Sequence, residues 1–228
     1  MEPSGSGGLV RISVDVGRWM LAWFIAWGCY YALIAHEVNY ISHPVGTAAY
    51  FLSAAAVVLV VYKDLFLAYI ALLKPASWTV PGLAFVVGLV IYIVLPLVLT
   101  PPHTLMLKNK DMFFLHLDLR YLFSKLFDIL FQQVLIFLLI ALLLRRKLSL
   151  RNISFLCCGL FGMVHLYLLK QNGLALGGYF VLFSMAAGLT FPFLIVRCRT
   201  GLAYTSSLHL LFYVITGVVC WLCPSALV

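Results

Sequence analysis

Charged residues are scarce in this 228-residue chain: Lys, Arg, Asp and Glu make up 10% of it, and hydrophobic residues 64%. A soluble globular domain has about 25% charged residues, so the composition excludes that class. The 15 basic residues lie in short stretches between apolar runs. They form no basic stripe interleaved with aromatic residues, which argues against a nucleic-acid partner. The composition predicts an all-α, polytopic transmembrane helical bundle surrounded by the lipid bilayer.

The chain also lacks a disulfide framework, an internal repeat and a low-complexity tract. Three of its six cysteines, Cys29, Cys157 and Cys158, fall inside apolar runs, where cysteine acts as a small hydrophobic residue. Cys220 and Cys223 have the spacing of a redox pair, but this spacing arises often by chance on a helix. The missing repeat weakens one alternative function, a small transporter or lipid-binding protein, because many transporters are built from repeated halves.

Seven apolar segments are long enough to cross the hydrocarbon core, which takes about 20 residues. They cover approximately residues 18–36, 45–62, 79–100, 121–144, 153–170, 174–196 and 202–223. We expect a disordered lead-in over residues 1–17, which begin with small polar side chains, and a single transmembrane helical domain over 18–228. Residues 65–73 are too short to span. Residues 101–120 mix charged with bulky apolar side chains, which indicates an interfacial or re-entrant segment that would raise the count to eight.

The positions of Lys and Arg predict the orientation, because these residues are enriched in cytoplasmic loops. With a cytoplasmic amino terminus, ten of the 15 fall on the inner side and five on the outer side. The loop from Arg145 to Arg151 contributes four of the inner ten. We therefore expect a multi-pass integral membrane protein with its amino terminus in the cytoplasm and its carboxyl terminus outside.

A few polar residues interrupt the later helices: Asp128, Gln132, Gln133, His165 and His209. Polar side chains cost free energy inside a membrane, so they usually face the bundle interior and mark a candidate site. At a rise of 1.5 Å per residue from the nearest inner basic residue, Gln132, His165 and His209 lie at depths of about 20, 21 and 15 Å. The three therefore share a level near the middle of the membrane. The alternative is that they only hold helices together, each bond contributing about 0.6–2 kcal/mol.

The same residues resemble the motifs of a known family. Phe161 and His165 form Phe-x-x-x-His, and His209 ends the stretch Arg199-Thr-Gly-Leu-Ala-Tyr-Thr-Ser-Ser-Leu-His. In order and spacing, residues 121–215 resemble the CAAX protease and bacteriocin-processing (CPBP) family, the glutamic intramembrane proteases. That family carries Glu-Glu-x-x-x-Arg, Phe-x-x-x-His and His-x-x-x-Asn on successive membrane helices. The resemblance implies an intramembrane protease-like bundle that acts on a membrane-anchored peptide or protein without a cofactor.

The chain departs from the family in its chemistry. Gln132 and Gln133 stand where the family has paired glutamates, Phe137 replaces the arginine and Tyr213 the asparagine. In the family a glutamate is taken to activate water, and a neutral amide cannot serve as that general base. Gln132 can still hydrogen-bond a peptide backbone, because an amide both donates and accepts. We expect a catalytically impaired relative that binds a transmembrane or carboxy-terminal peptide segment, as a scaffold or accessory in protein processing.

An active endopeptidase or carboxy-terminal sorting protease is the main alternative. Asp128 is the only carboxylate in the last four helices and lies one turn from Gln132. It would act as the base with His165 and His209 at the family positions, or else it pairs with Lys125 or simply meets water near the outer interface. The alternatives predict different surroundings for the carboxylate.

Other candidates are weaker. A zinc ion on the two histidines would need a third ligand, for which only Asp128 or a cysteine is at hand. Cys158 lies seven residues before His165, so a Cys–His nucleophile pair is a further alternative. Three residues near the histidines are expected to contact a bound segment: Phe161, Ser206 and Tyr213.

Overall fold

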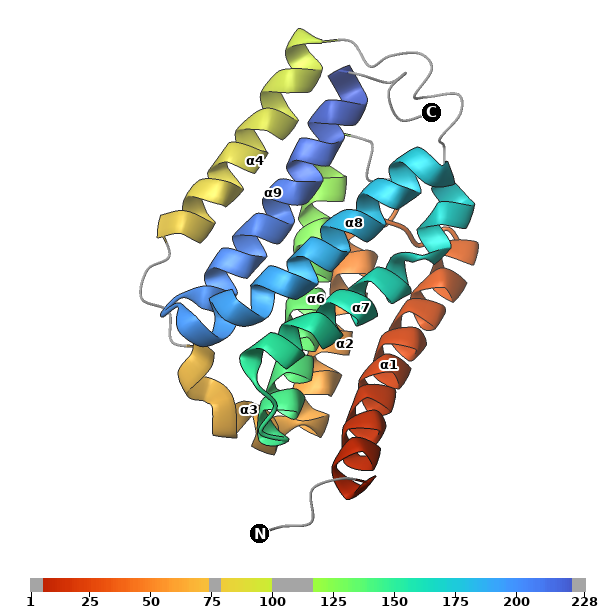
Figure 1. The fold of residues 1–228 in the computed structure, drawn as a ribbon. Helices are drawn as coiled ribbons and strands as arrows, with labels where there is room; N and C mark the ends of the chain where they lie inside the picture. The colour runs from red at the N-terminus through yellow and green to blue at the C-terminus, as the bar shows by residue number, and fades with distance from the viewer. Residues whose placement is uncertain (1–5, 74–78, 100–116, 223–228) are drawn as a thin grey trace.

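Helix is the only regular secondary structure in residues 6–73, 79–99 and 117–222, the part of the chain that the computed structural model describes. The seven long helices are α1 (Ser6–Ala35), α2 (Pro44–Val61), α4 (Thr79–Val98), α6 (Leu119–Arg145), α7 (Leu150–His165), α8 (Tyr167–Arg197) and α9 (Gly201–Leu222) (Figure 1). A short helix, α3 (Lys63–Tyr69), and a 3-10 turn, η1 (Ile70–Leu73), follow α2. The predicted all-α class is confirmed. The expected apolar segments fall on these helices in order, but the segment 153–170 runs past the end of α7 at His165 into α8.

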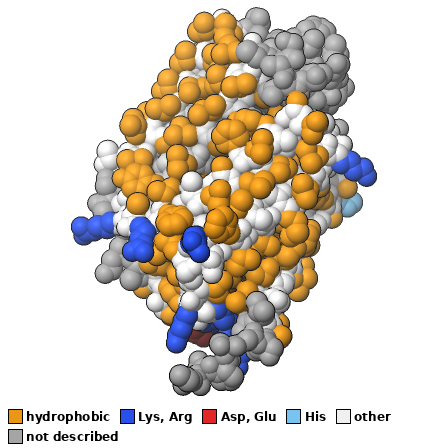
Figure 2. All heavy atoms as spheres, viewed as in Figure 1, with side chains coloured by type: hydrophobic (Ala, Val, Ile, Leu, Met, Phe, Trp, Pro, Cys, Tyr) orange, Lys and Arg blue, Asp and Glu red, His pale blue; other side chains and the backbone are white. Residues whose placement is uncertain are grey.

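Among the described residues, four helices are long and apolar enough to cross a membrane: Pro44–Val61, Leu119–Arg145, Tyr167–Arg197 and Gly201–Leu222. Apolar side chains cover much of the face seen in Figure 2, and Lys and Arg lie mostly in the lower half of that view. Val60, Leu97 and Leu174 are 71%, 81% and 84% exposed. Such a surface is unfavourable in water and suits contact with lipid. The fold is that of a membrane protein, and these four helices account for four of the seven expected spans.

Helix α6 is the central helix of the bundle. Every side chain from Leu135 to Leu143 is buried, and α1, α2, α4, α7 and α9 all contact this helix. A helix that is hydrophobic on all sides can be buried on all sides. Phe137, which the resemblance aligns with the arginine of the glutamic intramembrane proteases, is 1% exposed, and its ring centroid lies 5.1 Å from that of Phe66. This position therefore belongs to the apolar core.

Helices α7 and α8 pack against each other at very short range. The backbone of α8 is interrupted at Gly173, whose φ of 77° lies in the region that favours glycine, so α8 consists of a short and a long piece. A Cβ atom at Gly188 would lie 2.5 Å from the backbone nitrogen of Cys158. Only a residue without a side chain permits this approach. The contact holds α7, which carries Phe161 and His165, close to α8.

The first helix corrects the prediction of a disordered lead-in over residues 1–17 from residue 6 onward, because α1 begins at Ser6. Asp15 is 1% exposed and lies between two guanidinium groups. Its carboxylate accepts from Arg145 Nη2 over 3.3 Å and from Arg146 Nε over 2.7 Å. Charge-assisted bonds of this kind hold the start of α1 against the α6–α7 connection, 130 residues away in sequence. Local composition gave no sign of these distant partners.

Of two connecting segments predicted from the sequence, the structure describes one completely and the other only in part. The segment 65–73, expected to be too short to span, completes α3 and forms η1. Of the predicted interfacial segment, 101–120, residues 101–116 lie outside the described part of the chain. From Asp118 onward the chain is described, and the Asp118 carboxylate caps α6 by accepting from the backbone nitrogen of Arg120 over 2.7 Å. Residues 1–5, 74–78 and 223–228, and with them Cys223, also lie outside the described part.

Candidate functional site

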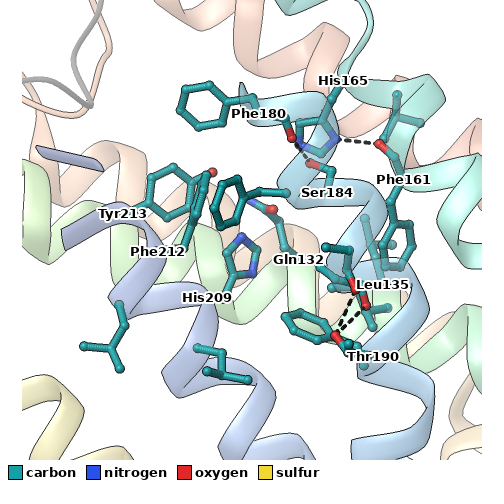
Figure 3. A pocket seen from close by; sticks show the side chains of 18 of the residues that line it. Gln132, Leu135, Phe161, His165, Phe180, Ser184, Thr190, His209, Phe212 and Tyr213 are labelled. Carbon is teal, nitrogen blue, oxygen red and sulfur yellow. Dashed lines mark hydrogen bonds between the residues drawn. The ribbon is translucent and has the colours of Figure 1, made fainter. Parts of the chain in front are cut away.

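A cavity of about 510 Å³ lies among α1, α6, α7, α8 and α9. Nine of its 22 described lining residues are aromatic: Trp19, Trp23, Phe161, Tyr179, Phe180, Phe183, Phe191, Phe212 and Tyr213. Gln132, His165 and His209 also line it, and Figure 3 shows the carboxamide of Gln132 between the two imidazole rings. The depth estimated from the sequence placed these three polar residues at one level, and the structure places all three in the wall of one cavity. A largely apolar pocket of about 300–1,000 Å³ with a few polar groups is typical of ligand-binding sites.

Asp128 lies behind Gln132 and does not line the cavity. Its Oδ1 accepts from Gln132 Nε2 over 2.8 Å. Its Oδ2 accepts from the hydroxyl of Tyr40 over 2.9 Å and forms an ion pair with Lys125. The carboxylate is fully buried. We refer to Tyr40, Lys125 and Asp128 as the ionic cluster. Of the surroundings considered for Asp128, the structure has the pair with Lys125.

Tyr213 connects the ionic cluster to the cavity. Lys125 Nζ lies 3.8 Å from the centroid of the Tyr213 ring, a distance at which the ring attracts the ammonium group. The Tyr213 ring also stacks on His209, with centroids 5.5 Å apart and planes inclined by 20°. Lys125 is only 6% exposed, so its charge is met by Asp128 and by aromatic faces rather than by water. The expected position of Tyr213 beside the binding space is therefore observed.

Gln133 does not line the cavity but holds His209 from the side of α6. Gln133 Nε2 lies 3.2 Å from His209 Nδ1 and 3.5 Å from the backbone oxygen of Thr205. Gln133 Oε1 accepts from the Thr205 hydroxyl over 2.9 Å. Gln133 and Thr205 are both buried. The neighbouring amides thus have different places, Gln132 in the cavity wall and Gln133 between α6 and α9.

His165 is oriented within its own helix. Its Nδ1 lies 2.7 Å from the backbone oxygen of Phe161, one turn earlier. The Phe161 ring, with its centroid 6.2 Å from that of Trp19, forms part of the cavity wall. Trp19 Nε1 in turn donates to the backbone oxygen of Leu135 over 2.9 Å, which ties α1 to α6. The Phe-x-x-x-His motif therefore supplies both an aromatic wall and an oriented imidazole.

Other sequence candidates lie elsewhere. Ser206, which was expected to contact a bound segment, does not line the cavity, and its hydroxyl donates to the backbone oxygen of Leu202 over 2.8 Å. Cys158 does not line the cavity either. Within the described ranges, no three His, Cys, Asp or Glu side chains lie close enough together to hold a metal ion. The zinc alternative therefore lacks its third ligand there.

Several contributing residues were not found from the sequence. Thr205 lies one turn before His209 on the same helix face, a spacing that indicates a shared network. Trp19 and Tyr40 have no comparable signal, because they reach the site from α1 and from the α1–α2 connection. Their contacts depend on tertiary packing.

Comparisons with models of protein families, with curated proteins and with solved structures find no match for this chain. The resemblance to the glutamic intramembrane proteases therefore rests on the motifs at Gln132, Phe161, His165 and His209. The geometry itself provides an aromatic cavity with an amide and two imidazoles and, in its described lining, no carboxylate. Such a wall can donate and accept hydrogen bonds, but it has no acid group to activate water.

Proposed function

We propose that this chain is a catalytically impaired, CAAX-protease-like membrane protein that binds a peptide segment in the cavity without hydrolysing it. One observation carries the proposal: polar side chains from α6, α7 and α9 converge on an aromatic cavity whose described lining contains no carboxylate. The protein would act as a scaffold or accessory in the processing of membrane-anchored proteins. Its divergence from the glutamic intramembrane proteases would lie in the exchange of acids for amides at Gln132 and Gln133.

The size of the cavity limits which part of a segment it encloses. A 20-residue helix is about 30 Å long and about 10 Å across, so it occupies on the order of 2,500 Å³. The cavity, at about 510 Å³, is several times smaller. We therefore propose that it takes a carboxy-terminal end or a short unwound stretch, whose backbone amides are free to pair with the cavity wall.

The lining residues suggest how such a segment enters. Phe183 of α8 and Leu208 and Ile215 of α9 line the cavity and are also about half exposed. Apolar side chains at such an opening favour entry from lipid rather than from water. We propose that the ligand reaches the cavity sideways from the bilayer, between α8 and α9.

The active-protease alternative has less support. A general base must reach the proton that it removes, directly or through one water molecule. Asp128 is fully buried, and Tyr40, Lys125 and Gln132 already bond to its two oxygens. Using it as a base would require breaking the ionic cluster.

The proposal includes the expected topology of seven spans, with the amino terminus in the cytoplasm and the carboxyl terminus outside. The ion pairs of Asp15 with Arg145 and Arg146 support this arrangement, since they hold the start of α1 and the α6–α7 connection at one end of the bundle. A reporter enzyme that folds only outside the cytoplasm should be active when fused after Val228 and inactive when inserted at Lys147. The reverse pattern would contradict the orientation.

Photo-crosslinking tests the binding function. The protein in lipid nanodiscs would be mixed with N-acetyl-trileucine amide in which one leucine carries a diazirine, and the labelled sites mapped by mass spectrometry. We expect labels on cavity residues such as Phe183 and Leu208, and intact peptide after incubation. Ala186→Trp, at an exposed position of the cavity lining, should reduce labelling. Ala56→Trp, at an exposed position of α2, should not.

Two outcomes would count against the proposal. Labels spread over lipid-facing surfaces, unchanged by Ala186→Trp, would mean that the cavity takes no peptide. Cleaved peptide with the wild type but not with Asp128→Asn would favour the protease instead.

A further inference from the structure

We infer that Gln132, His165 and His209, three of the polar side chains that line the cavity, present one donor and two acceptors in a fixed pattern that selects an uncharged amide over an ester or a carboxylate. The pattern belongs to Gln132, His165 and His209, which we refer to as the polar strip. The inference rests on the proposed function, because it specifies the chemical group that the cavity binds. It depends on the hydrogen-bond partners that each of the three side chains has outside the cavity.

The imidazole of His209 is set as a donor. The orientation of Gln133 is fixed by Thr205, whose backbone oxygen lies near Nε2 and whose hydroxyl donates to Oε1. Gln133 therefore presents an N–H group to His209 Nδ1, 3.2 Å away. A proton on Nδ1 would face that N–H group, so Nδ1 accepts and the ring proton lies on Nε2. The nitrogen left for the cavity is an N–H donor.

The imidazole of His165 is set the opposite way. Its Nδ1 lies 2.7 Å from the backbone oxygen of Phe161, which can only accept. Nδ1 therefore carries the proton, and Nε2 keeps a free lone pair. The two histidines, both in the cavity lining, are thus held as opposite tautomers by partners on different helices.

The amide of Gln132 is set as an acceptor. Its Nε2 donates to Asp128 Oδ1, and the other oxygen of that carboxylate accepts from Tyr40 and Lys125. A flipped amide would bring two oxygens together, so Oε1 is the atom left for the cavity. The ionic cluster therefore acts on the site indirectly, as a positioning device for Gln132. In Figure 3 the Gln132 carboxamide lies between the imidazoles of His165 and His209.

An amide complements this strip. Its C=O group can accept from His209 Nε2, and its N–H group can donate to Gln132 Oε1 or His165 Nε2. An ester lacks the N–H group and leaves both acceptors unpaired. A carboxylate would place its charge against two acceptors, in a lining that contains no Lys or Arg within the described residues. Because unpaired polar atoms are costly in an apolar cavity, both should bind more weakly than the amide.

Matched small probes test the selectivity. N-octylacetamide, octyl acetate and decanoate would compete with the diazirine peptide for the protein in nanodiscs, at concentrations corrected for partition into lipid. We expect the amide to compete at a concentration at least tenfold lower than the ester or the carboxylate. Gln132→Met should reduce that preference to less than threefold. Ser206→Ala, on α9 but outside the cavity lining, should leave it unchanged.

The tautomers provide a readout that needs no ligand. Nitrogen NMR of ¹⁵N-histidine-labelled protein, with signals assigned by His165→Asn and His209→Asn, should give a protonated Nε2 in His209 and a protonated Nδ1 in His165. Equal competition by amide and ester, or the same tautomer in both rings, would overturn the inference. Peptide labelling that avoids the cavity would instead overturn the proposed function, whatever the tautomers are.

Discussion

The ionic cluster and the polar strip meet on α6, where Asp128 and Gln132 lie one helical turn apart, but their polar atoms have opposite surroundings. In the ionic cluster, both oxygens of Asp128 have partners, and the carboxylate and the ammonium of Lys125 are buried away from the cavity. In the polar strip, each side chain has one end bonded to the protein and the other end facing the cavity. A satisfied network fixes structure, whereas a half-satisfied group beside a cavity is available to a ligand.

The largest effect is expected from breaking the ionic cluster on one side. Asp128→Asn removes the charge that pairs with Lys125 and leaves a buried ammonium without its counterion. Breaking a buried ion pair in this way costs about 3–5 kcal/mol. We expect a loss of that size in the free energy of unfolding, measured in bicelles by reversible denaturation. A loss below about 1 kcal/mol would mean that the pair is not buried as described.

The matched control replaces both charges. Lys125→Met with Asp128→Leu removes the pair without leaving an isolated charge, and such replacements are often neutral in stability. We expect the double variant to be more stable than either single variant, which a double-mutant cycle measures as a coupling. It should still bind amides less selectively, because Gln132 loses its partner. Additive losses would contradict the pairing.

A smaller loss in the free energy of unfolding is expected from a change in the helix packing that positions the polar strip. Gly188→Ala would place a Cβ 2.5 Å from the backbone of Cys158 and separate α7 from α8. Overpacking of this kind costs about 1–3 kcal/mol. The same unfolding measurement should find no loss for Gly28→Ala, where a Cβ meets nothing within 4 Å. Equal effects at the two glycines would contradict the close contact of α7 with α8.

A buried amide next to the strip should have a somewhat smaller effect on stability. Gln133→Met removes the partners of His209 Nδ1 and of the Thr205 hydroxyl. Loss of a buried hydrogen-bond partner costs about 1–3 kcal/mol, and the Thr205 hydroxyl also has the backbone oxygen of Leu202 at 3.0 Å, so we expect the lower end of that range. NMR should also detect an altered tautomer balance in His209. An unchanged His209 signal would mean that Gln133 does not set the tautomer.

The smallest effect is expected at Ser206. Its hydroxyl bonds only within α9 in the described structure, and Ser206→Ala should change the free energy of unfolding by less than about 0.5 kcal/mol. Peptide labelling should also be unchanged. A clear loss of labelling would restore the role in substrate contact that the sequence suggested.

The helices and the shared depth of the polar strip could be predicted because they follow from local properties. Apolar length defines a span, and a rise of 1.5 Å per residue places Gln132, His165 and His209 at similar levels. The rotation of each helix about its axis is not local, and it decides that Gln132 faces the cavity while Gln133 faces α9. It also turns Ser206 away from the cavity.

Contacts between residues far apart in the sequence could not be predicted either. Tyr40 meets Asp128 from 88 residues away, and Asp15 meets Arg145 from 130 residues away. Neither pairing leaves a trace in spacing or composition. The sequence therefore left the role of Asp128 open between base and ion pair, and it assigned Asp15 to a disordered lead-in. Tertiary contacts decide both questions.

The most direct test is an electron cryo-microscopy structure of the protein in a lipid nanodisc with N-acetyl-trileucine amide. We predict intact peptide in the cavity between α8 and α9, with one carbonyl oxygen about 3 Å from His209 Nε2 and one amide nitrogen at a similar distance from Gln132 Oε1 or His165 Nε2. A peptide bound elsewhere, a cleaved peptide, or Asp128 released from Lys125 and turned toward the scissile carbonyl would contradict the account.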